Sequence, residues 1–218
     1  MDHAVNQFQI DKIQISYENI PLAVFLLGAN GSGKSTLRNY LNLSDIQTNI
    51  DPDVLNRVFK LRYPDSYLIE SAKQALTMYN QGVSSGLNIC IESTLSGRGT
   101  IERIKAAKAN GYFIVAYFVG LESLELNIER VRQRVLSGGH NIPTETITRR
   151  YTESINNFIK CIHLFDEVHI IDNSDKSYNL QISKFSDKLV SYIDDIEPWV
   201  SNIVKNDKLL KSALALEI

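Results

Sequence analysis

The feature that most constrains this chain is a glycine-rich segment between an apolar run and a helical pattern. Its residues, Gly28-Ala-Asn-Gly-Ser-Gly33-Lys34-Ser35, fit the pattern G-x-x-x-x-G-K-[ST] without a mismatch. The apolar run before it, Ala23–Leu27, is typical of a buried strand. Glycine lets such a loop curl, so that backbone N–H groups at a helix N-terminus point at the phosphates of a nucleotide. A glycine-rich turn that matches by chance is the alternative, and the strand-to-helix frame argues against it.

Each part of this loop has an expected task in binding ATP or GTP. Lys34 would reach the β- and γ-phosphates, and the Ser35 hydroxyl would ligate Mg²⁺. We therefore predict ATP and Mg²⁺ as cofactors, with Ser35 as the metal ligand. The predicted nucleotide-binding residues are Gly28, Ala29, Asn30, Gly31, Ser32, Gly33, Lys34, Ser35 and Thr36.

Short apolar runs alternate with longer helical patterns along the chain, which is typical of a βαβ domain with a parallel sheet. A chain of 218 residues suits one such domain. We predict a three-layer α/β/α P-loop NTPase fold with a mostly parallel five-stranded sheet. The predicted strands are Ala23–Leu27, Gln47–Ile50, Asn88–Ile91, Tyr112–Val119 and Glu167–Ile171; the predicted helices are Lys34–Asn42, Pro52–Phe59, Tyr67–Ser85, Thr100–Ala109, Leu121–Leu136 and Thr144–His163.

The pattern changes after residue 174. The segments Ile182–Phe185 and Leu189–Ile193 read as short strands, and Pro198–Ile218 reads as an amphipathic helix. We therefore predict a P-loop domain over residues 1–174. A small C-terminal β and helical appendage over residues 175–218 is expected to pack on the same domain.

Composition restricts the class of partner. The net charge of −2 and the pI near 6.1 argue against nucleic acid as a partner. No apolar run approaches the ~20 residues of a membrane span, and the first residues lack the pattern of a signal peptide. Cys90 and Cys161 fall in apolar patterns, which indicates reduced core thiols. We predict a cytoplasmic protein that binds neither nucleic acid nor membrane.

Acidic residues follow two predicted strands, at the edge where ligands of open α/β sheets bind. Asp51 and Asp53 come after one strand, and Glu92 ends the next. A phosphoryl-transfer enzyme needs a carboxylate here to take the proton of the attacking hydroxyl, and groups that hold Mg²⁺ and its waters. Asp51 could instead cap a helix, and Asp53 could be a favourable first-turn acid. Glu92 has few structural reasons to end an apolar strand, which favours a functional role.

An arginine-rich segment covers about residues 130–150. It reads as a helix, a Gly-Gly pair and a second helix, which fits a mobile lid. Enzymes that transfer phosphoryl groups need cations over the γ-phosphate, often carried on such a lid. A solvated helix face is the alternative. The arginines of the segment are Arg130, Arg132, Arg134, Arg149 and Arg150.

Taken together, these motifs resemble the zeta-toxin-like P-loop kinases, a family that includes bacterial proteins labelled predicted ABC-type ATPases. The resemblance spans roughly residues 22–174, and the order and spacing of its pieces specify more than the P-loop alone. Four pieces carry it: Leu26-Leu-Gly-Ala-Asn-Gly-Ser-Gly-Lys-Ser-Thr36, Asn49-Ile-Asp-Pro-Asp53, Ile91-Glu-Ser-Thr-Leu-Ser-Gly-Arg98 and Glu129–Arg150.

The resemblance implies an ATP-dependent kinase that acts on a hydroxyl of a UDP-sugar-like acceptor, with UDP-N-acetylglucosamine as the first candidate. In this family the second acid of the strand-2 motif activates the sugar hydroxyl, and it matches Asp53. The family also implies an antitoxin protein as a partner. The predicted catalytic residues are Lys34, Asp53, Glu92, Arg132, Arg134 and Arg149; the predicted substrate-binding residues are Asp51, Asp53, Glu92, Thr94 and Arg98.

Two positions depart from the family pattern. Zeta toxins place an arginine soon after the strand-3 acid, where this chain has Ser96 and its nearest arginine is Arg98. An acidic position in the preceding helix is apolar here, near Leu76. Phosphate transfer therefore carries over better than UDP-N-acetylglucosamine as the acceptor.

Other functions fit parts of the sequence. Leu136-Ser-Gly-Gly-His140 resembles the signature of ABC ATPases, but Asp166-Glu167 precede a strand instead of ending one. A P-loop phosphotransferase for another small metabolite or an antibiotic is the main alternative. A non-kinase P-loop ATPase, or a regulator that binds nucleotide with little turnover, is a further one.

Overall fold

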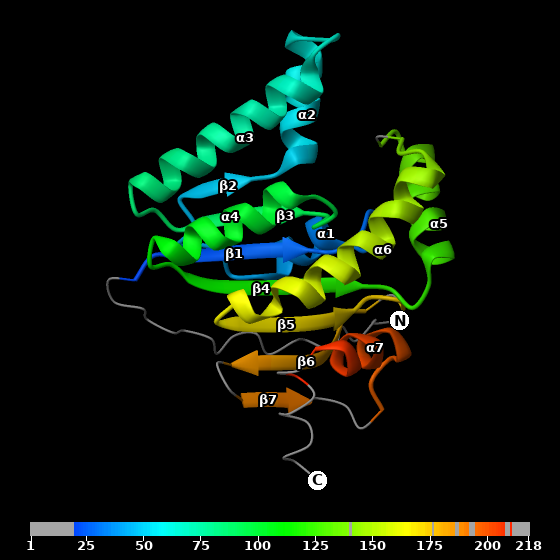
Figure 1. The fold of residues 1–218 in the computed structure, drawn as a ribbon. Coiled ribbons are helices and arrows are strands. Elements are labelled where there is room, and N and C mark those ends of the chain that lie inside the picture. Colours follow the sequence, from blue (N-terminus) through cyan, green and yellow to red (C-terminus); the bar gives the residue numbers. More distant parts are fainter. Residues whose placement is uncertain are drawn as a thin grey trace.

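A seven-stranded sheet with the order β2-β3-β1-β4-β5-β6-β7 organises the structure, a computed structural model (Figure 1). The structure describes residues 20–139, 141–175, 177–185, 188–191, 195–207 and 210. Of the predicted parts, residues 1–19, His140, 192–193, 208–209 and 211–218 lie outside the described residues. The helix predicted over Pro198–Ile218 ends at Asn206. The strands are β1 (Leu22–Leu27), β2 (Thr48–Ile50), β3 (Ile89–Ser93), β4 (Phe113–Gly120), β5 (Glu167–Asp172), β6 (Asn179–Phe185) and β7 (Lys188–Ser191).

The first five strands are parallel, as the alternating pattern predicts. β1 lies between β3 and β4, so its carboxyl end meets the ends of both neighbours at one edge of the sheet. β5 is buried along its whole length, and only the first residue of β1 is partly exposed. This continuous burial is why both strands read as apolar runs.

Helices follow the parallel strands in the predicted order, with shifted ends. The predicted helix Lys34–Asn42 is shorter in the structure and continues as a 3₁₀ turn. Ser123 caps the helix predicted over Leu121–Leu136, so that it begins at Leu124. The helices are α1 (Lys34–Leu37), α2 (Pro52–Arg62), α3 (Tyr67–Ser84), α4 (Arg98–Ala109), α5 (Leu124–Leu136), α6 (Thr144–Cys161) and α7 (Pro198–Asn206), with 3₁₀ turns η1 (Arg38–Tyr40) and η2 (Ile162–Leu164).

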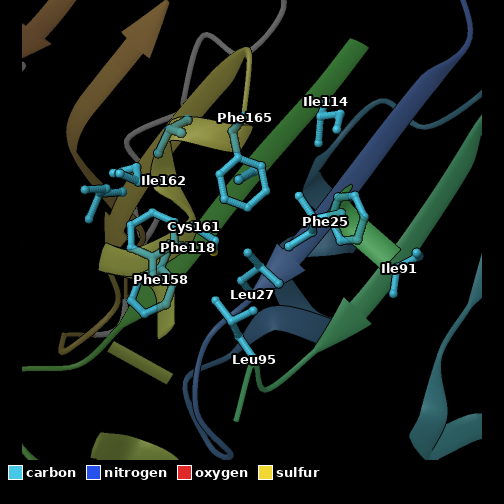
Figure 2. Close-up of a cluster of buried hydrophobic side chains, with 14 of the residues drawn as sticks. Phe25, Leu27, Ile91, Leu95, Ile114, Phe118, Phe158, Cys161, Ile162 and Phe165 are labelled. Atoms are coloured by element: carbon cyan, nitrogen blue, oxygen red, sulfur yellow. The ribbon is translucent and has the colours of Figure 1, made fainter. Parts of the chain in front are cut away.

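The larger hydrophobic core lies on the sheet face that α3, α4, α6 and α7 cover. Aromatic rings dominate its centre, where Phe118 of β4 and Phe158 of α6 stack with their centroids 4.2 Å apart (Figure 2). Phe25 and Phe165 meet edge to face beside this pair. A smaller core on the opposite face packs under α1 and the chain that follows it. Helices therefore lie on both faces, as the predicted three-layer fold requires.

The strand count is where the fold prediction was wrong. The two short C-terminal strands extend the main sheet, because β6 pairs antiparallel with β5 and β7 pairs with β6. The helix that follows, α7, returns to the end of β4 and buries Trp199. The indole Nε1 donates to Asp172 Oδ1 at 2.9 Å. The sequence pattern predicts the two short strands, but it does not predict that they pair with β5 at the edge of the main sheet.

The contact between α7 and β4 leads to a testable prediction. A Cβ built on Gly120 would lie 2.4 Å from the Trp199 ring, so Gly120→Ala must displace α7 or β4. We expect a loss of about 1–3 kcal/mol in the free energy of unfolding, the usual cost of overpacking, measured by urea denaturation. Gly99→Ala in α4 is the matched control, because its Cβ meets nothing within 4 Å. Equal stability of the two variants would contradict the docking of α7.

Candidate active site

The P-loop curls between β1 and α1 through glycines in a left-handed or near-mirror backbone conformation. Gly28, Gly31 and Gly33 have φ angles of 138°, 81° and 101°. Space is also short, because Cβ atoms built at these positions would lie 2.1 Å from the Val119 carbonyl oxygen, 2.6 Å from that of Asn127 and 2.3 Å from Asn173 Nδ2. Both the backbone conformation and the close approach therefore require glycine.

Two P-loop carbonyls accept hydrogen bonds from nearby buried side chains. Lys34 Nζ donates to the Ala29 carbonyl oxygen at 2.9 Å. Asn127, on α5, donates through Nδ2 to the Asn30 carbonyl oxygen at 2.7 Å. The lysine is part of the motif, but Asn127 is one buried amide among many polar residues of a helix. Nothing in the sequence singled it out.

Two further P-loop carbonyls are satisfied from the segment between β5 and β6. Asn173 Nδ2 donates to the Ser32 carbonyl oxygen at 2.8 Å, and the Tyr178 hydroxyl donates to that of Gly33 at 2.8 Å. These donors lie more than 140 positions along the chain from their acceptors. The loop is thus held by side chains from three separate parts of the fold.

The end of β3 places Glu92 directly beside the first turn of α1. Ser35 Oγ donates to Glu92 Oε1 at 2.8 Å. The carboxyl group is buried, and its Oε2 has no hydrogen-bond partner among the described residues. A hydroxyl and a carboxylate with a spare oxygen fit Mg²⁺ bound through phosphates and water, the usual arrangement for this ion. In the described part of the chain, no three His, Cys, Asp or Glu residues gather as an all-protein metal site.

Burial and charge act in opposite directions on the two ionisable groups of this region. Burial lowers the pKa of Lys34, while the negative charges of Glu92, Asp53 and Asp51 raise it in part. Burial raises the pKa of Glu92, and Lys34 with the Ser35 hydrogen bond counteracts that effect. Burial therefore disfavours the charged forms of both Lys34 and Glu92, and each charge partly stabilises the other. Perturbed groups of this kind cluster at functional sites.

The two aspartates after β2 have different surroundings. Asp51 Oδ1 accepts from the backbone N–H of Asp53 at 2.9 Å and of Val54 at 3.2 Å, so Asp51 caps α2. Its other oxygen lies 3.7 Å from Arg38 Nη1. The structural alternative for Asp51 is thereby observed, and its predicted contact with substrate stays a prediction.

Asp53 instead directs its carboxylate across the site to the lid segment. Its Oδ2 lies 3.6 Å from Arg134 Nη1 on α5. About half of the carboxylate is exposed, so it is accessible from solvent. Its charge also acts on Lys34 and on Arg150. The charges of Asp53 and Glu92 thus both act on Lys34 of the P-loop.

The arginines of α5 and α6 divide into two groups. Arg134 meets Asp53, and Arg150 Nη1 donates to Asn30 Oδ1 in the P-loop at 3.0 Å. Burial lowers the pKa of Arg150. Sequence reasoning placed Arg150 in the lid but did not choose it as a catalytic residue. Helical periodicity alone does not say which side of α6 meets the loop.

The other predicted lid arginines lie on outer faces. Arg132 pairs with Glu129 at 3.1 Å on α5, and Arg149 pairs with Glu153 at 2.6 Å on α6. The side chain of Arg132 is 69% exposed and that of Arg149 is 57% exposed. The structure therefore does not bring these two predicted catalytic residues to the P-loop.

Arg130 has a different partner, because its Nη2 donates to the carbonyl oxygens of residues 173, 174 and 175 at 2.6–3.0 Å. It thereby holds the same segment that supplies Asn173 to the P-loop. Its role in this structure is to fix that segment.

The loop after β3 carries the remaining predicted substrate-binding residues. Thr94 Oγ1 lies 2.9 Å from Ser96 Oγ, and Arg98 is exposed at the start of α4. Between them, buried Leu95 has a φ of 54°, a rare conformation for leucine. The Asn157 side chain on α6 donates to the Leu95 carbonyl oxygen at 2.9 Å and so holds this loop against α6.

The raised pKa of Glu92 predicts how its removal affects stability. Because the folded state binds this proton more tightly than the unfolded chain, stability declines as the pH rises from about 4.5 through the folded-state pKa. Glu92→Gln keeps an oxygen for Ser35 and removes the buried charge. We expect a higher melting temperature than wild type at pH 8, with the difference shrinking towards pH 4.5, in a calorimetric pH series. A variant that is less stable than wild type at pH 8 would contradict this electrostatic account.

Within the described residues, no helix is long and apolar enough to cross a membrane.

Comparisons with known proteins show which family the chain belongs to. An uncharacterized protein of Haemophilus influenzae is 36% identical over 129 residues, covering 59% of this chain and 91% of that protein. The structure of AvrRxo1-ORF1:-ORF2 with ATP aligns with a TM-score of 0.61 at 16% identity, over 91% of this chain and 76% of that one. The PezAT toxin-antitoxin system of Streptococcus pneumoniae aligns with a TM-score of 0.57 at 16% identity, over 90% and 84%.

A chain of the Pnkp1/Rnl/Hen1 RNA repair complex shares the fold less extensively, with a TM-score of 0.53 at 22% identity over 67% of this chain and 48% of that one. At these identities the structural likeness shows the fold alone. The family model described as Zeta toxin matches residues 8–184, which include the P-loop, both strand-end acids and the arginine-rich helices. The chain therefore belongs to the zeta toxin family of P-loop proteins.

Proposed function

We propose that this protein is an ATP-dependent kinase that transfers the γ-phosphoryl group to a hydroxyl of a small-molecule acceptor. The observation that carries the proposal is the position of Asp53. Its half-exposed carboxylate lies 3.6 Å from Arg134 Nη1, and its negative charge raises the pKa of the P-loop lysine, Lys34. A P-loop that only binds nucleotide has no need of an accessible base at this point.

ATP is supported as the donor by the form of the P-loop and by its family. The curled loop bonds its carbonyls to protein donors. Its N–H groups would face the phosphates, apart from that of Ser32, which donates to the Ala29 carbonyl oxygen at 3.3 Å. A solved structure of the same fold, AvrRxo1-ORF1:-ORF2, is a complex with ATP. Ser35 would hold Mg²⁺, and the free Glu92 Oε2 would accept from one of its waters. Bound Mg²⁺ would offset charge on the β- and γ-phosphates.

The proposed step uses groups of this chain at both ends of the reaction. Asp53 takes the proton of the acceptor hydroxyl as that oxygen bonds to the γ-phosphorus. The bond from the γ-phosphorus to the β–γ bridging oxygen breaks, and ADP leaves. Lys34 would offset the negative charge that develops on the phosphates, because its ammonium group lies against the P-loop, 2.9 Å from the Ala29 carbonyl oxygen.

We assign the cationic clamp to Arg134 and Arg150. Both guanidinium groups point towards the site: that of Arg134 lies 3.6 Å from Asp53, and that of Arg150 donates to Asn30 of the P-loop. In this structure they are held by protein acceptors, which a triphosphate with its greater charge would replace. Arg132 and Arg149, with glutamate partners on their own helices, are not part of this proposal.

UDP-N-acetylglucosamine is the first acceptor to test, because the family resemblance of the strand-2 motif points to a UDP-sugar. The proposed acceptor side consists of Asp53, Thr94 and Arg98, with Asp51 holding α2 in place. Another metabolite or an antibiotic is the alternative acceptor. Zeta toxins have an acidic residue near the position of Leu76, which is apolar and 48% exposed here. This difference is the reason to test acceptors other than UDP-sugars as well.

A protein partner belongs to the same proposal. The PezAT structure is that of a chromosomal toxin-antitoxin system, and the AvrRxo1 structure is a complex of two gene products. We propose that this chain acts in the cytoplasm and is held inactive there by an antitoxin of that kind.

The proposed base is tested by Asp53→Asn. We expect turnover to fall by about 10²–10⁴, the usual contribution of a positioned general base, while ATP binding is retained. The assay is mass spectrometry of purified protein with Mg·ATP and a panel of UDP-sugars, free sugars, nucleosides and aminoglycosides. A phosphorylated product that survives Asp53→Asn unchanged would remove Asp53 as the base. ATP hydrolysis without any phosphorylated product would favour a regulatory ATPase.

The clamp is tested by two matched pairs of arginines. We expect Arg134→Ala and Arg150→Ala to lower kcat by about 10³ or more, as for arginines that contact a transferring phosphate. Arg132→Ala and Arg149→Ala should stay within about threefold of wild type, because surface pairs of this kind contribute little. Steady-state kinetics with the identified acceptor distinguish the two groups. A larger loss of kcat in Arg132→Ala and Arg149→Ala than in Arg134→Ala and Arg150→Ala would contradict this assignment of the clamp.

A further inference from the structure

A small cavity lies against the P-loop, where α5, α6 and α7 meet the end of β4. Its polar wall includes Ser32 of the P-loop, Asn127 of α5 and Ser154 of α6. Its apolar wall includes Phe118 and Trp199. Its volume is about 10 Å³. None of the charged residues proposed for phosphoryl transfer lines it.

Three unsatisfied polar atoms belong to residues that line this one cavity. Ser32 Oγ, Asn127 Oδ1 and Ser154 Oγ have no hydrogen-bond partner among the described residues. The three residues are at most 1% exposed. Buried polar groups are nearly always hydrogen-bonded, because leaving one unpaired costs about 1–3 kcal/mol. Three such atoms from three elements therefore indicate a bound partner.

The size and chemistry of the cavity restrict that partner. A volume of about 10 Å³ is at the lower limit for one water molecule and too small for a metabolite. The lining residues carry no charged side chain, so neither a cation nor an anion would be compensated there.

We propose that one internal water molecule binds here and joins the P-loop to α5 and α6. The amide of Asn127 already donates through Nδ2 to the Asn30 carbonyl oxygen, so its Oδ1 accepts from the water. The water donates its second hydrogen to one serine hydroxyl and accepts from the other. This gives three hydrogen bonds, the usual number for a buried water.

The water site has a consequence for nucleotide binding. Ser32 stands in the middle of the P-loop, and its own carbonyl is held by Asn173. The water fixes the side chain of the same residue to α5 and α6. Movement of either helix is thereby transmitted to the P-loop backbone. This part of the proposal rests on the P-loop binding ATP.

A crystal structure at a resolution that shows ordered water tests the site directly. We expect one water within about 2.7–3.2 Å of Ser32 Oγ, Asn127 Oδ1 and Ser154 Oγ. A dry cavity, or side chains turned to pair with one another, would overturn the proposal. This test needs neither an acceptor nor turnover.

The substitution Ser154→Ala gives a second test in which the sign of the effect decides. If the hydroxyl holds a water, its loss leaves the other two atoms poorly paired, and the melting temperature falls by about 2–4 °C. If the hydroxyl has no partner, its removal relieves an unpaired buried group and the melting temperature rises. Ser137→Ala is the control, because that exposed hydroxyl donates to the Gln133 carbonyl oxygen of α5, away from the cavity. A rise for Ser154→Ala would overturn the water site.

The link to the P-loop is tested by the affinity for ATP. Trp199 is the one tryptophan of the sequence and lines the cavity, so its fluorescence reports on this region. We expect Ser154→Ala to raise the dissociation constant for ATP several-fold, with Ser137→Ala unchanged. An unchanged dissociation constant would overturn the link. Failure of the wild type to bind ATP would instead count against the proposed function.

Discussion

The structure depends on how the P-loop satisfies its carbonyl groups. A loop that turns its N–H groups towards phosphate turns its carbonyls towards the protein, where water does not reach them. Side chains must then supply the donors, since an unpaired buried carbonyl is costly. Lys34, Asn127, Asn173 and Tyr178 do so here, from α1, α5 and the segment before β6. The phosphate site is therefore assembled only when these distant segments are in place.

This dependence gives the C-terminal part of the chain a role in the site. Trp199 of α7 bonds to Asp172, and the same carboxylate accepts from the backbone and hydroxyl of Ser174. The segment from Asp172 to Tyr178 is thus held on one side by α7 and on the other by Arg130. Because β6 and β7 extend the same sheet, this region shares one core with the nucleotide site.

The charges around the P-loop are arranged for a ligand that brings more negative charge. Burial disfavours the charged form of Lys34 and of Glu92, and each supports the other only in part. Arg134 and Arg150 take protein oxygens as acceptors. Phosphates would supply Lys34 and both arginines with a stronger partner. Such preorganised charge, set before the substrate arrives, is what electrostatic stabilisation of a transition state requires.

The sequence by itself determined the P-loop, the parallel strands and the acids Asp53 and Glu92 at the strand ends, because these follow from local spacing and from continuous burial. Only the tertiary structure decided that Arg150, and not Arg149, meets the P-loop, and that β6 joins β5. Helical periodicity separates the faces of α6 but does not say which face lies inward. That choice depends on packing between segments far apart in the chain, which no local pattern encodes.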